Sequence, residues 1–351
     1  MRLSRLVPAR LRPAARLAQQ RLRRFRRIMV YGAQACPAIL MYHRIAEPEF
    51  DPWRLSVSPA NFEDQMRVLK ARRNVMPLNQ LVDGLREGSL PPGATAITFD
   101  DGYQDNLLCA VPILERSGMT ATIFPVMGVI GSGIPFWWDD LARMVLGNPA
   151  ARELDIPTGT GRLRASWGRS APDEGAWHAD QPPRTLRQAA YLKIWRLLQG
   201  MNEAERGVAM QTIRRQLLPN GDVRDDTSAA IPMTGRMLAE CLDRGMDLGG
   251  HGRSHVPLPT ADDDAAFAEI AGGRADLAAI TGKDASAFAY PHGEHDARIR
   301  TMVSSAGYAF AVDTRDDLVE PRGYDLFALP RLATGNYGGA ELCSRIAALG
   351  G

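Results

Sequence analysis

Cysteine, lysine and long apolar runs are scarce in this sequence. Its four cysteines, Cys36, Cys109, Cys241 and Cys343, lie far apart among 351 residues, without the CxxC or Cys/His spacing of a metal site. This excludes a disulfide-rich scaffold, and we expect free thiols in packed helices. No stretch reaches the roughly 18 apolar residues of a membrane-spanning helix. With 45% hydrophobic and 23% charged residues, the chain has a globular composition and enough length for a large core.

Negative charge is missing from the first 27 residues, which contain ten arginines and no acidic residue. The whole chain has 42 Lys and Arg and 40 Asp and Glu, so the part after residue 27 has 32 basic and 40 acidic residues and a formal charge of −8. The overall charge of +2 hides this difference. We therefore treat residues 1–37 as a basic leader on an otherwise acidic protein.

Three interpretations of this leader remain open. Leu, Val and Phe among arginines are typical of a basic amphipathic helix on an anionic membrane surface. Basic tails also contact nucleic acid, but no nucleic-acid-binding motif follows, and we expect no specific nucleic acid partner. The third interpretation is a disordered leader. The apolar run before Gly32 has only four residues, too few for the core of a signal peptide. We therefore expect a cytoplasmic or peripheral inner-membrane protein rather than a secreted one.

From residue 38 onward, strand-like apolar runs alternate with helix-like segments. We predict strands at 38–42, 94–99, 120–126, 246–249, 285–290 and 308–312, and helices at 59–73, 78–86, 104–117, 234–244, 263–280 and 296–306. Ser58 and Pro59 are typical of a helix start, and Gly118 of a helix end. This alternation predicts an α/β fold with a parallel sheet, most economically a distorted (β/α) barrel of about seven strands.

The alternation is interrupted at 133–232. This stretch begins with an aromatic group, continues through a Gly-, Arg- and Pro-rich region at 150–184 that we expect to be irregular, and ends with amphipathic helices near 185–199 and 203–217. We predict a mostly helical insertion within one domain that spans 38–351.

Polar residues follow the predicted strands repeatedly. They are His43 after AILMY, Asp100 and Asp101 after ATAITF, His251 and His255 after MDLGG, and Tyr290, Pro291 and His292 at the end of SAFAY. In a parallel α/β barrel all strands end on one face, where active sites are built. We therefore expect these segments to converge, although up to 250 residues separate them in sequence.

The convergent residues are those of a metal-assisted hydrolase. Two histidines spaced i, i+4 and one aspartate make a facial set of ligands that leaves positions open for water and substrate. The second aspartate, beside the ligand, supplies a general base. DDG alone is also common in turns, so the combination carries this interpretation.

Three motifs resemble the polysaccharide deacetylase (NodB-homology) family. They are TFDDGY at 98–103, HGRSH at 251–255 and FAYPHG at 288–293. The resemblance implies a distorted (β/α) barrel and a divalent metal, usually zinc, with cobalt, nickel or iron as alternatives. It also implies hydrolysis of N-acetyl groups on amino-sugar polymers, as in exopolysaccharide or cell-surface polysaccharide synthesis. By position, Asp100 is the base, Asp101, His251 and His255 are the metal ligands, and the backbone N–H of Tyr103 helps to hold the oxyanion.

The sequence departs from this family in three places. The arginine that usually helps to set the base is replaced by Ala289, and the hydroxyl residue after the first metal histidine is replaced by Gly252. No histidine follows His295 to supply the acid. We therefore predict His43 as the acid, since its LMYH segment resembles the poly-N-acetylglucosamine deacetylases, with His292 in reserve. The alternative for His43 is a strand cap that bonds to backbone.

Further residues are assigned to the substrate pocket. Tyr290, Pro291 and His292 keep the shape of the third motif, and Arg331 is placed at the barrel rim. Trp137 and Trp138 either stack on sugar rings or pack the insertion onto the barrel. Three alternative functions remain: a glycan-binding barrel without turnover, an O-acetyl esterase, and a nucleic-acid-binding protein, which the acidic remainder disfavours.

Overall fold

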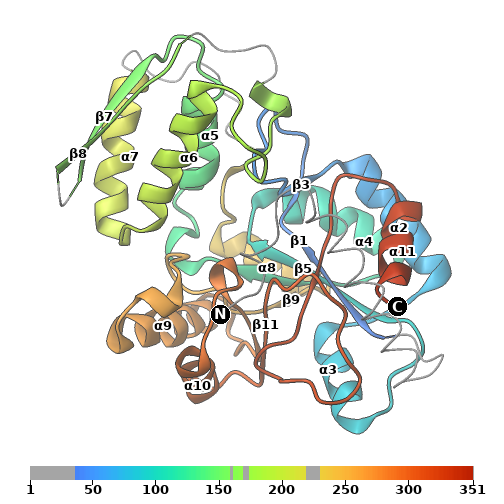
Figure 1. Ribbon diagram of the computed structural model, residues 1–351. Coiled ribbons are helices and arrows are strands. Elements are labelled where there is room, and N and C mark those ends of the chain that lie inside the picture. The colour runs from blue at the N-terminus through green and yellow to red at the C-terminus, as the bar shows by residue number, and fades with distance from the viewer. Residues whose placement is uncertain (1–35, 159–160, 169–173, 219–229, 351) are drawn as a thin grey trace.

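The computed structural model describes residues 36–158, 161–168, 174–218 and 230–350 (Figure 1). The leader therefore lies almost wholly outside the described residues. The helices are α2 (Pro59–Arg72), α3 (Leu78–Glu87), α4 (Val111–Ser117), α5 (Trp137–Val145), α6 (Leu186–Gln199), α7 (Glu203–Leu217), α8 (Gly235–Asp243), α9 (Asp263–Thr281), α10 (Ala297–Ser305) and α11 (Gly339–Ala348). The strands are β1 (Ala38–Tyr42), β2 (Arg44–Ile45), β3 (Ser56–Val57), β4 (Asn74–Val75), β5 (Ala94–Asp101), β6 (Thr122–Pro125), β7 (Glu153–Thr158), β8 (Gly161–Ser166), β9 (Asp247–Leu248), β10 (Ala287–Ala289), β11 (Phe310–Val312) and β12 (Leu332–Ala333).

A parallel sheet forms the centre of the molecule. Its strand order is β12-β1-β5-β6-β9, with β4 beside the start of β5. A second parallel pair, β10–β11, continues from it through a single bridge between Gly250 and Phe288, and another bridge joins Val312 to Leu329. The predicted parallel α/β fold is confirmed, while closure into a barrel of seven strands stays a prediction.

Local sequence explains the positions of the central elements. β5 is buried along its whole length, because helices cover both faces of the sheet, and therefore reads as an apolar run. α2 begins where the side chain of Ser58 accepts a hydrogen bond from the N–H of Asn61 and Pro59 fills the first turn. α9 begins at an Asp262 cap and ends at Gly282, whose φ of 69° is left-handed.

The insertion differs from its prediction in two ways. Residues 153–166 form the antiparallel hairpin β7–β8 inside the region expected to be irregular. Leu154 and Ile156 point inward in alternation, but arginines and a proline between the apolar residues obscure this period in the sequence. The aromatic stretch at the start of the insertion is also helical, as α5.

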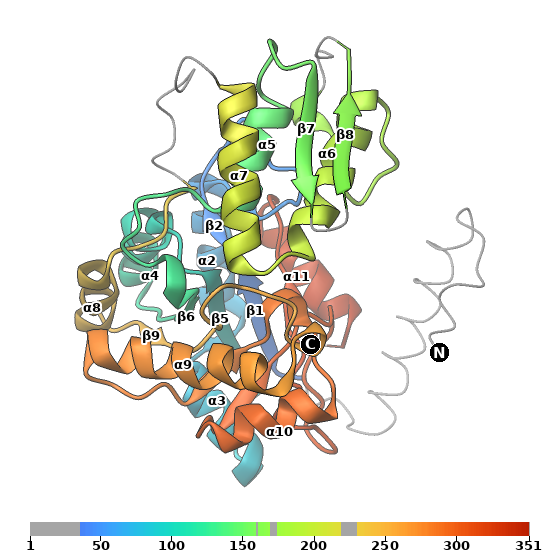
Figure 2. The same ribbon diagram turned by 90° about the vertical axis from the view of Figure 1, so that its left-hand side faces the viewer.

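The insertion has a hydrophobic core of its own. Side chains from α5, α6, α7 and the hairpin pack together, and Trp53 joins them from the loop between β2 and β3. Figures 1 and 2 show these elements grouped to one side of the sheet. A smaller aromatic cluster, which includes Tyr103, Phe136 and Trp138, connects the insertion with the end of β5. Among the described residues, no helix has the length and apolarity needed to cross a membrane.

Candidate active site

Six polar side chains meet where the central strands end. They are His43 after β1, Asp100 and Asp101 at the end of β5, His251 and His255 in the loop after β9, and Arg331 before β12. The expected convergence on the carboxyl ends of parallel strands is therefore what the fold produces. All except His43 are nearly or fully buried.

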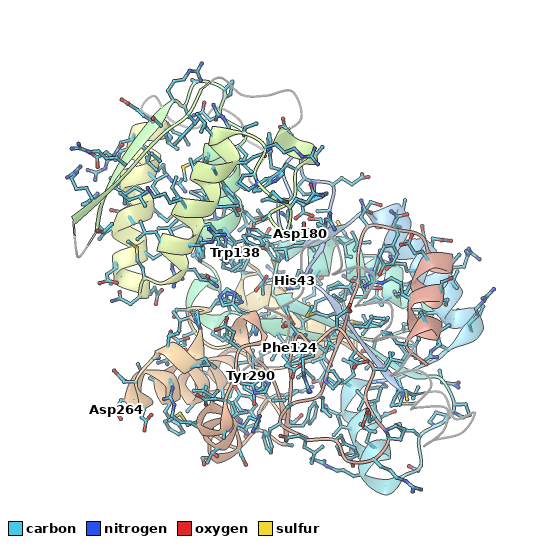
Figure 3. All side chains as sticks on the ribbon, in the orientation of Figure 1. His43, Phe124, Trp138, Asp180, Asp264 and Tyr290 are labelled. Carbon is cyan, nitrogen blue, oxygen red and sulfur yellow. The ribbon has the colours of Figure 1, made fainter. Side chains whose placement is uncertain are left out.

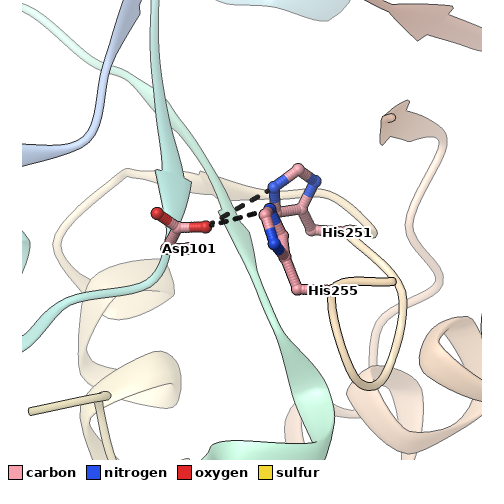
Figure 4. Close-up of side chains that lie close together, drawn as sticks. All are labelled: Asp101, His251 and His255. Carbon is pink, nitrogen blue, oxygen red and sulfur yellow. Dashed lines mark ion pairs between the residues drawn. The ribbon is translucent and has the colours of Figure 1, made fainter. Parts of the chain in front are cut away.

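Asp101, His251 and His255 face one another across a short gap (Figure 4). The Oδ1 atom of Asp101 lies 3.6 Å from Nε2 of His251 and 3.5 Å from Nε2 of His255. One ligand atom from each residue lies within 4.8 Å of the other two. Asp101 has a left-handed φ of 70° and is followed by Gly102 at 81°, so the chain turns sharply where the carboxylate meets the histidines.

The donor set of this group fits a divalent cation. Oδ1 of Asp101 is buried and has no hydrogen-bond partner among the described residues, although an orphaned carboxylate oxygen is costly. Two imidazoles and one carboxylate are ligands that suit zinc and other first-row metals. Asp101, His251 and His255 would hold such an ion.

The two histidines are oriented differently. Nδ1 of His251 lies 2.8 Å from the carbonyl oxygen of Ala289, a contact that directs Nε2 toward Asp101. Burial opposes a charge on His251, but the nearby carboxylates of Asp101 and Asp100 outweigh it and raise the pKa of His251. Nδ1 of His255 is buried without a partner among the described residues. Burial and three neighbouring histidines hold the pKa of His255 well below its usual value.

Asp100 forms a buried ion pair with Arg331. The guanidinium donates from both terminal nitrogens to the two carboxylate oxygens, at 2.6 Å each. It also donates to the carbonyl of Asp313 and to the hydroxyl of Thr98. Burial alone would raise the pKa of Asp100, but Arg331, with help from His251 and His43, lowers it to about 2. Asp100 is therefore a carboxylate throughout the neutral range.

This geometry corrects the expectation for Arg331. The side chain is fully buried, so it does not lie at an open rim. Arg331 pairs with the predicted base, and setting the base is the role that the resemblance gives to the arginine replaced here by Ala289. The sequence signal was weak, because Arg331 lies 231 residues from its partner and only the fold reveals the pair.

His43 stands at the solvent side of Asp100. Its Nε2 lies 4.0 Å from Oδ2 of Asp100, and 21% of its side chain is exposed. Its carbonyl accepts a hydrogen bond from the side chain of Asn106. His43 and Asp100 can therefore both reach a group bound between them. Among the residues that the structure describes, the imidazole makes no hydrogen bond to backbone of the kind expected of a strand cap.

Tyr103 is held from several sides. Its ring is buried under the guanidinium of Arg44, and its hydroxyl donates to Asp139 and accepts from Trp138, both at 2.7 Å. The carbonyl of Gly102 and the N–H of Gln104 pair with the segment 231–233, so the N–H of Tyr103 points away from that segment. That N–H is the predicted oxyanion donor.

A buried charge network that the sequence did not reveal supports Tyr103. Arg44 pairs with Asp105 at 3.2 Å and with Asp139 of α5 at 3.3 Å, and Asp105 also accepts from the N–H of Ile45. Burial raises the pKa of Asp139 to about 7 despite the cationic partner. No motif marks these residues, because their partners belong to three separate segments.

Residues of the third motif differ in their contacts, because Tyr290 and Pro291 are packed in the interior while His292 contacts His255. Tyr290 is fully buried, and its hydroxyl donates to the carbonyl of Phe327, so it is a packing residue. Pro291 is buried as well. The ring of His292 packs 4.4 Å from that of His255, and burial lowers the pKa of His292 to about 4. His292 therefore packs against a predicted ligand histidine rather than offering a protonated acid.

Trp137 and Trp138 join the predicted insertion to the end of the central sheet. Figure 3 labels Trp138. Its side chain is 7% exposed, and its ring centroid lies 5.1 Å from that of His255. Trp137 packs against Trp195 and beneath the guanidinium of Arg206. Of the two expectations for this pair, the packing one describes their contacts, and the expected sugar platform is wrong for the buried Trp138.

The family model for polysaccharide deacetylases matches residues 87–148 and 219–311. The chain carries a polysaccharide deacetylase domain. The unmatched residues 149–218 lie within the predicted insertion, whose two ends fall in the matched stretches. YxkH of Bacillus subtilis, itself assigned to the polysaccharide deacetylases, is 35% identical over 95 residues. These residues are 26% of this chain, and the match spans about a third (33%) of that relative.

Solved deacetylases share the fold of this domain. The Streptococcus pyogenes deacetylase PplD, determined in complex with acetate, has a TM-score of 0.57 and 17% identity, over 89% of this chain and 99% of that chain. A polysaccharide deacetylase from Bacillus cereus has a TM-score of 0.55 and 18% identity, over 89% of this chain and 69% of that chain. IcaB from Ammonifex degensii has a TM-score of 0.53 and 15% identity, over 90% of this chain and 97% of that chain.

Proposed function

We propose that this deacetylase domain is a metal-dependent hydrolase that removes N-acetyl groups from an amino-sugar glycan. The observation that carries the proposal is the buried group of Asp101, His251 and His255, with its orphaned oxygen, directly beside the ionised Asp100. The family assignment supports the substrate class. The donor set favours zinc, with cobalt, nickel or iron as alternatives.

A divalent cation, when bound, supplies positive charge that polarises the acetyl carbonyl and lowers the pKa of water. Asp100 takes the proton of the attacking water, and Arg331 keeps its carboxylate free to do so by two charge-assisted hydrogen bonds. The N–H of Tyr103 donates to the oxygen on which negative charge develops.

His43 supplies the proton that the leaving amine needs. Amines are poor leaving groups until protonated, so a general acid is required on the side of the sugar. His43 is the partly exposed imidazole beside Asp100, and the 4.0 Å separation allows one site to hold both base and acid. Arg331 and His43 together weigh against the alternative of a glycan-binding barrel without turnover.

The test is release of acetate from N-acetylglucosamine oligomers by the metal-stripped full chain after addition of Zn²⁺, Co²⁺ or Ni²⁺. We expect activity only with metal, and loss of turnover without loss of metal in Asp100→Asn. Asp101→Asn should lose both. Undiminished turnover by Asp100→Asn would refute the assigned base. Metal bound by Asp101, His251 and His255 without turnover on any N- or O-acetylated glycan would favour the binding protein.

A further inference from the structure

Glu269 of α9 holds the loop that carries the two histidines. Its Oε2 accepts hydrogen bonds from the N–H groups of Arg253 at 2.9 Å and Ser254 at 2.8 Å. Its Oε1 accepts from the hydroxyl of Ser254 at 2.6 Å. One carboxylate thus collects three donors from the middle of the loop, and charge-assisted bonds of this kind are stronger than neutral ones.

The carbonyl groups of the same loop are held elsewhere. Those of Gly252 and Arg253 accept from the N–H groups of Met127 and Gly128, which follow β6, and that of Ser254 accepts from Arg206. Among the described residues, Glu269 is the acceptor for both inner N–H groups. The loop backbone is therefore fixed on two sides, with α9 providing one of them.

α9 approaches this loop very closely. A Cβ atom added to Gly273 would lie 3.0 Å from the backbone of Gly252, so a larger residue there would press on the loop. Gly252 and His255 have left-handed φ angles of 76° and 56°. A left-handed φ angle is unfavourable for a residue other than glycine, so surrounding contacts have to maintain this conformation at His255.

The dependence on Glu269 differs between the two histidines. His251 is oriented by its own ring contact with Ala289, as a metal-binding histidine usually is. Nδ1 of His255 has no such partner among the described residues, and its ring is in packing contact with the rings of Trp138, His251 and His292. The position of Nε2 in His255 therefore follows from the loop backbone, which Glu269 holds.

We propose that Glu269 is a positioning residue for His255, and so sets the affinity of the site for its divalent cation. This inference rests on the proposed function, since it concerns the metal site on which that function depends. Glu269 acts here in place of the ring contact that His255 lacks. Ser254, whose hydroxyl completes the contact, supplies the polar group that Gly252 does not carry.

The test measures Co²⁺ binding by visible absorption in the metal-stripped full chain, with Zn²⁺ competition. Changes to residues that orient metal ligands typically weaken affinity about 10- to 100-fold, and we expect this range for Glu269→Ala, with an altered Co²⁺ spectrum. Glu269→Gln should lose less, because its amide oxygen still accepts a hydrogen bond. If the alanine variant fails to fold, Glu269→Gln alone still tests the proposal.

Asp276→Asn is the matched control. Asp276 lies two turns further along α9 and pairs with the guanidinium of Arg253 at 2.6 and 2.8 Å, without contacting the loop backbone. We expect the Kd of the Asp276→Asn variant for Co²⁺ to stay within about twofold of wild type. Unchanged Kd and spectrum in both Glu269 variants, or an equal loss in Asp276→Asn, would overturn the role of Glu269. Co²⁺ binding that Asp101→Asn does not weaken would instead overturn the metal site and the proposed function with it.

Discussion

A buried carboxylate stays ionised only where partners compensate for its lost hydration, and Asp100 depends on Arg331 for this. The pair is fully enclosed, and the guanidinium is fixed in turn by the carbonyl of Asp313 and the hydroxyl of Thr98. Removing one member of such a pair leaves an uncompensated charge, which costs about 3–5 kcal/mol. At the scale of single residues, the ionisation of the predicted base thus depends on a partner that no local motif contains.

Arg331→Met should therefore impair both folding stability and turnover. We expect the free energy of unfolding to fall by about 3–5 kcal/mol and kcat by about 10²- to 10⁴-fold, the usual contribution of a general base. Urea unfolding and acetate release measure the two effects. Arg116→Gln is the control, because the pair of Arg116 with Glu63 is about 60% exposed and should change stability by less than about 1 kcal/mol. Full turnover in Arg331→Met would show that Asp100 needs no cationic partner.

His43→Ala should affect amide and ester substrates unequally. An ester leaves as an alcohol and needs less help from an acid than an amine does. We expect turnover of N-acetylated oligomers to fall by about 10²- to 10⁴-fold, and turnover of O-acetylated sugars to fall much less. Metal content should not change, since His43 lies outside the group of Asp101, His251 and His255. Equal losses on both substrates would argue for a role of His43 other than acid.

At the scale of elements, α5 links the insertion to the site. Its Trp138 and Asp139 both bond to the hydroxyl of Tyr103, and Asp139 also pairs with Arg44, which follows His43 directly. The first helix of the insertion therefore supports the segments that carry the predicted oxyanion donor and the predicted acid. An insertion with its own core is in this way coupled to the end of the central sheet.

Asp139→Asn should change how stability depends on pH. Burial raises the pKa of Asp139 to about 7, above its value in an unfolded chain. The folded state then binds the proton more tightly, so the contribution of Asp139 to stability is present at low pH and is lost as pH rises toward 7. Asparagine does not titrate, and its oxygen still accepts from Tyr103. Relative to wild type, we expect the Tm of the variant to improve between pH 5 and pH 8. A constant difference in Tm would contradict the raised pKa.

Elements with capping residues in the adjacent sequence could be predicted to within a few residues, and others could not. Helix α9 begins at an aspartate cap and ends at a left-handed glycine, and both signals lie in adjacent sequence. The hairpin β7–β8 has no comparable signal, because arginines and a proline obscure its apolar alternation. The two-residue strands β2 and β3 are too short to show a period. The same division applies to the site. The motifs at 98–103 and 251–255 identify the residues that face one another, whereas the supports from Arg331, Asp139 and Glu269 arise only from tertiary contacts.

At the scale of the whole molecule, charge and chemistry occupy different parts of the chain. Every candidate site residue lies between residues 43 and 331, in the part whose formal charge is −8. The ten arginines of the leader precede the first strand. An acidic body is repelled by an anionic bilayer, while clustered arginines contribute about 1 kcal/mol each near such a surface.

Truncation to residues 36–351 should therefore separate membrane affinity from catalysis. We expect the truncated protein to keep its metal affinity and kcat on soluble oligomers, because the site contacts that the structure describes lie within these residues. Co-sedimentation of the full chain with vesicles that contain anionic lipid should be strong at low salt and weak at 0.5 M salt, where charges are screened over a few ångströms. It should be lost on truncation and absent with neutral vesicles. Vesicle binding that persists after truncation would place the membrane contact on the acidic domain, and equal binding to neutral vesicles would make it apolar rather than electrostatic.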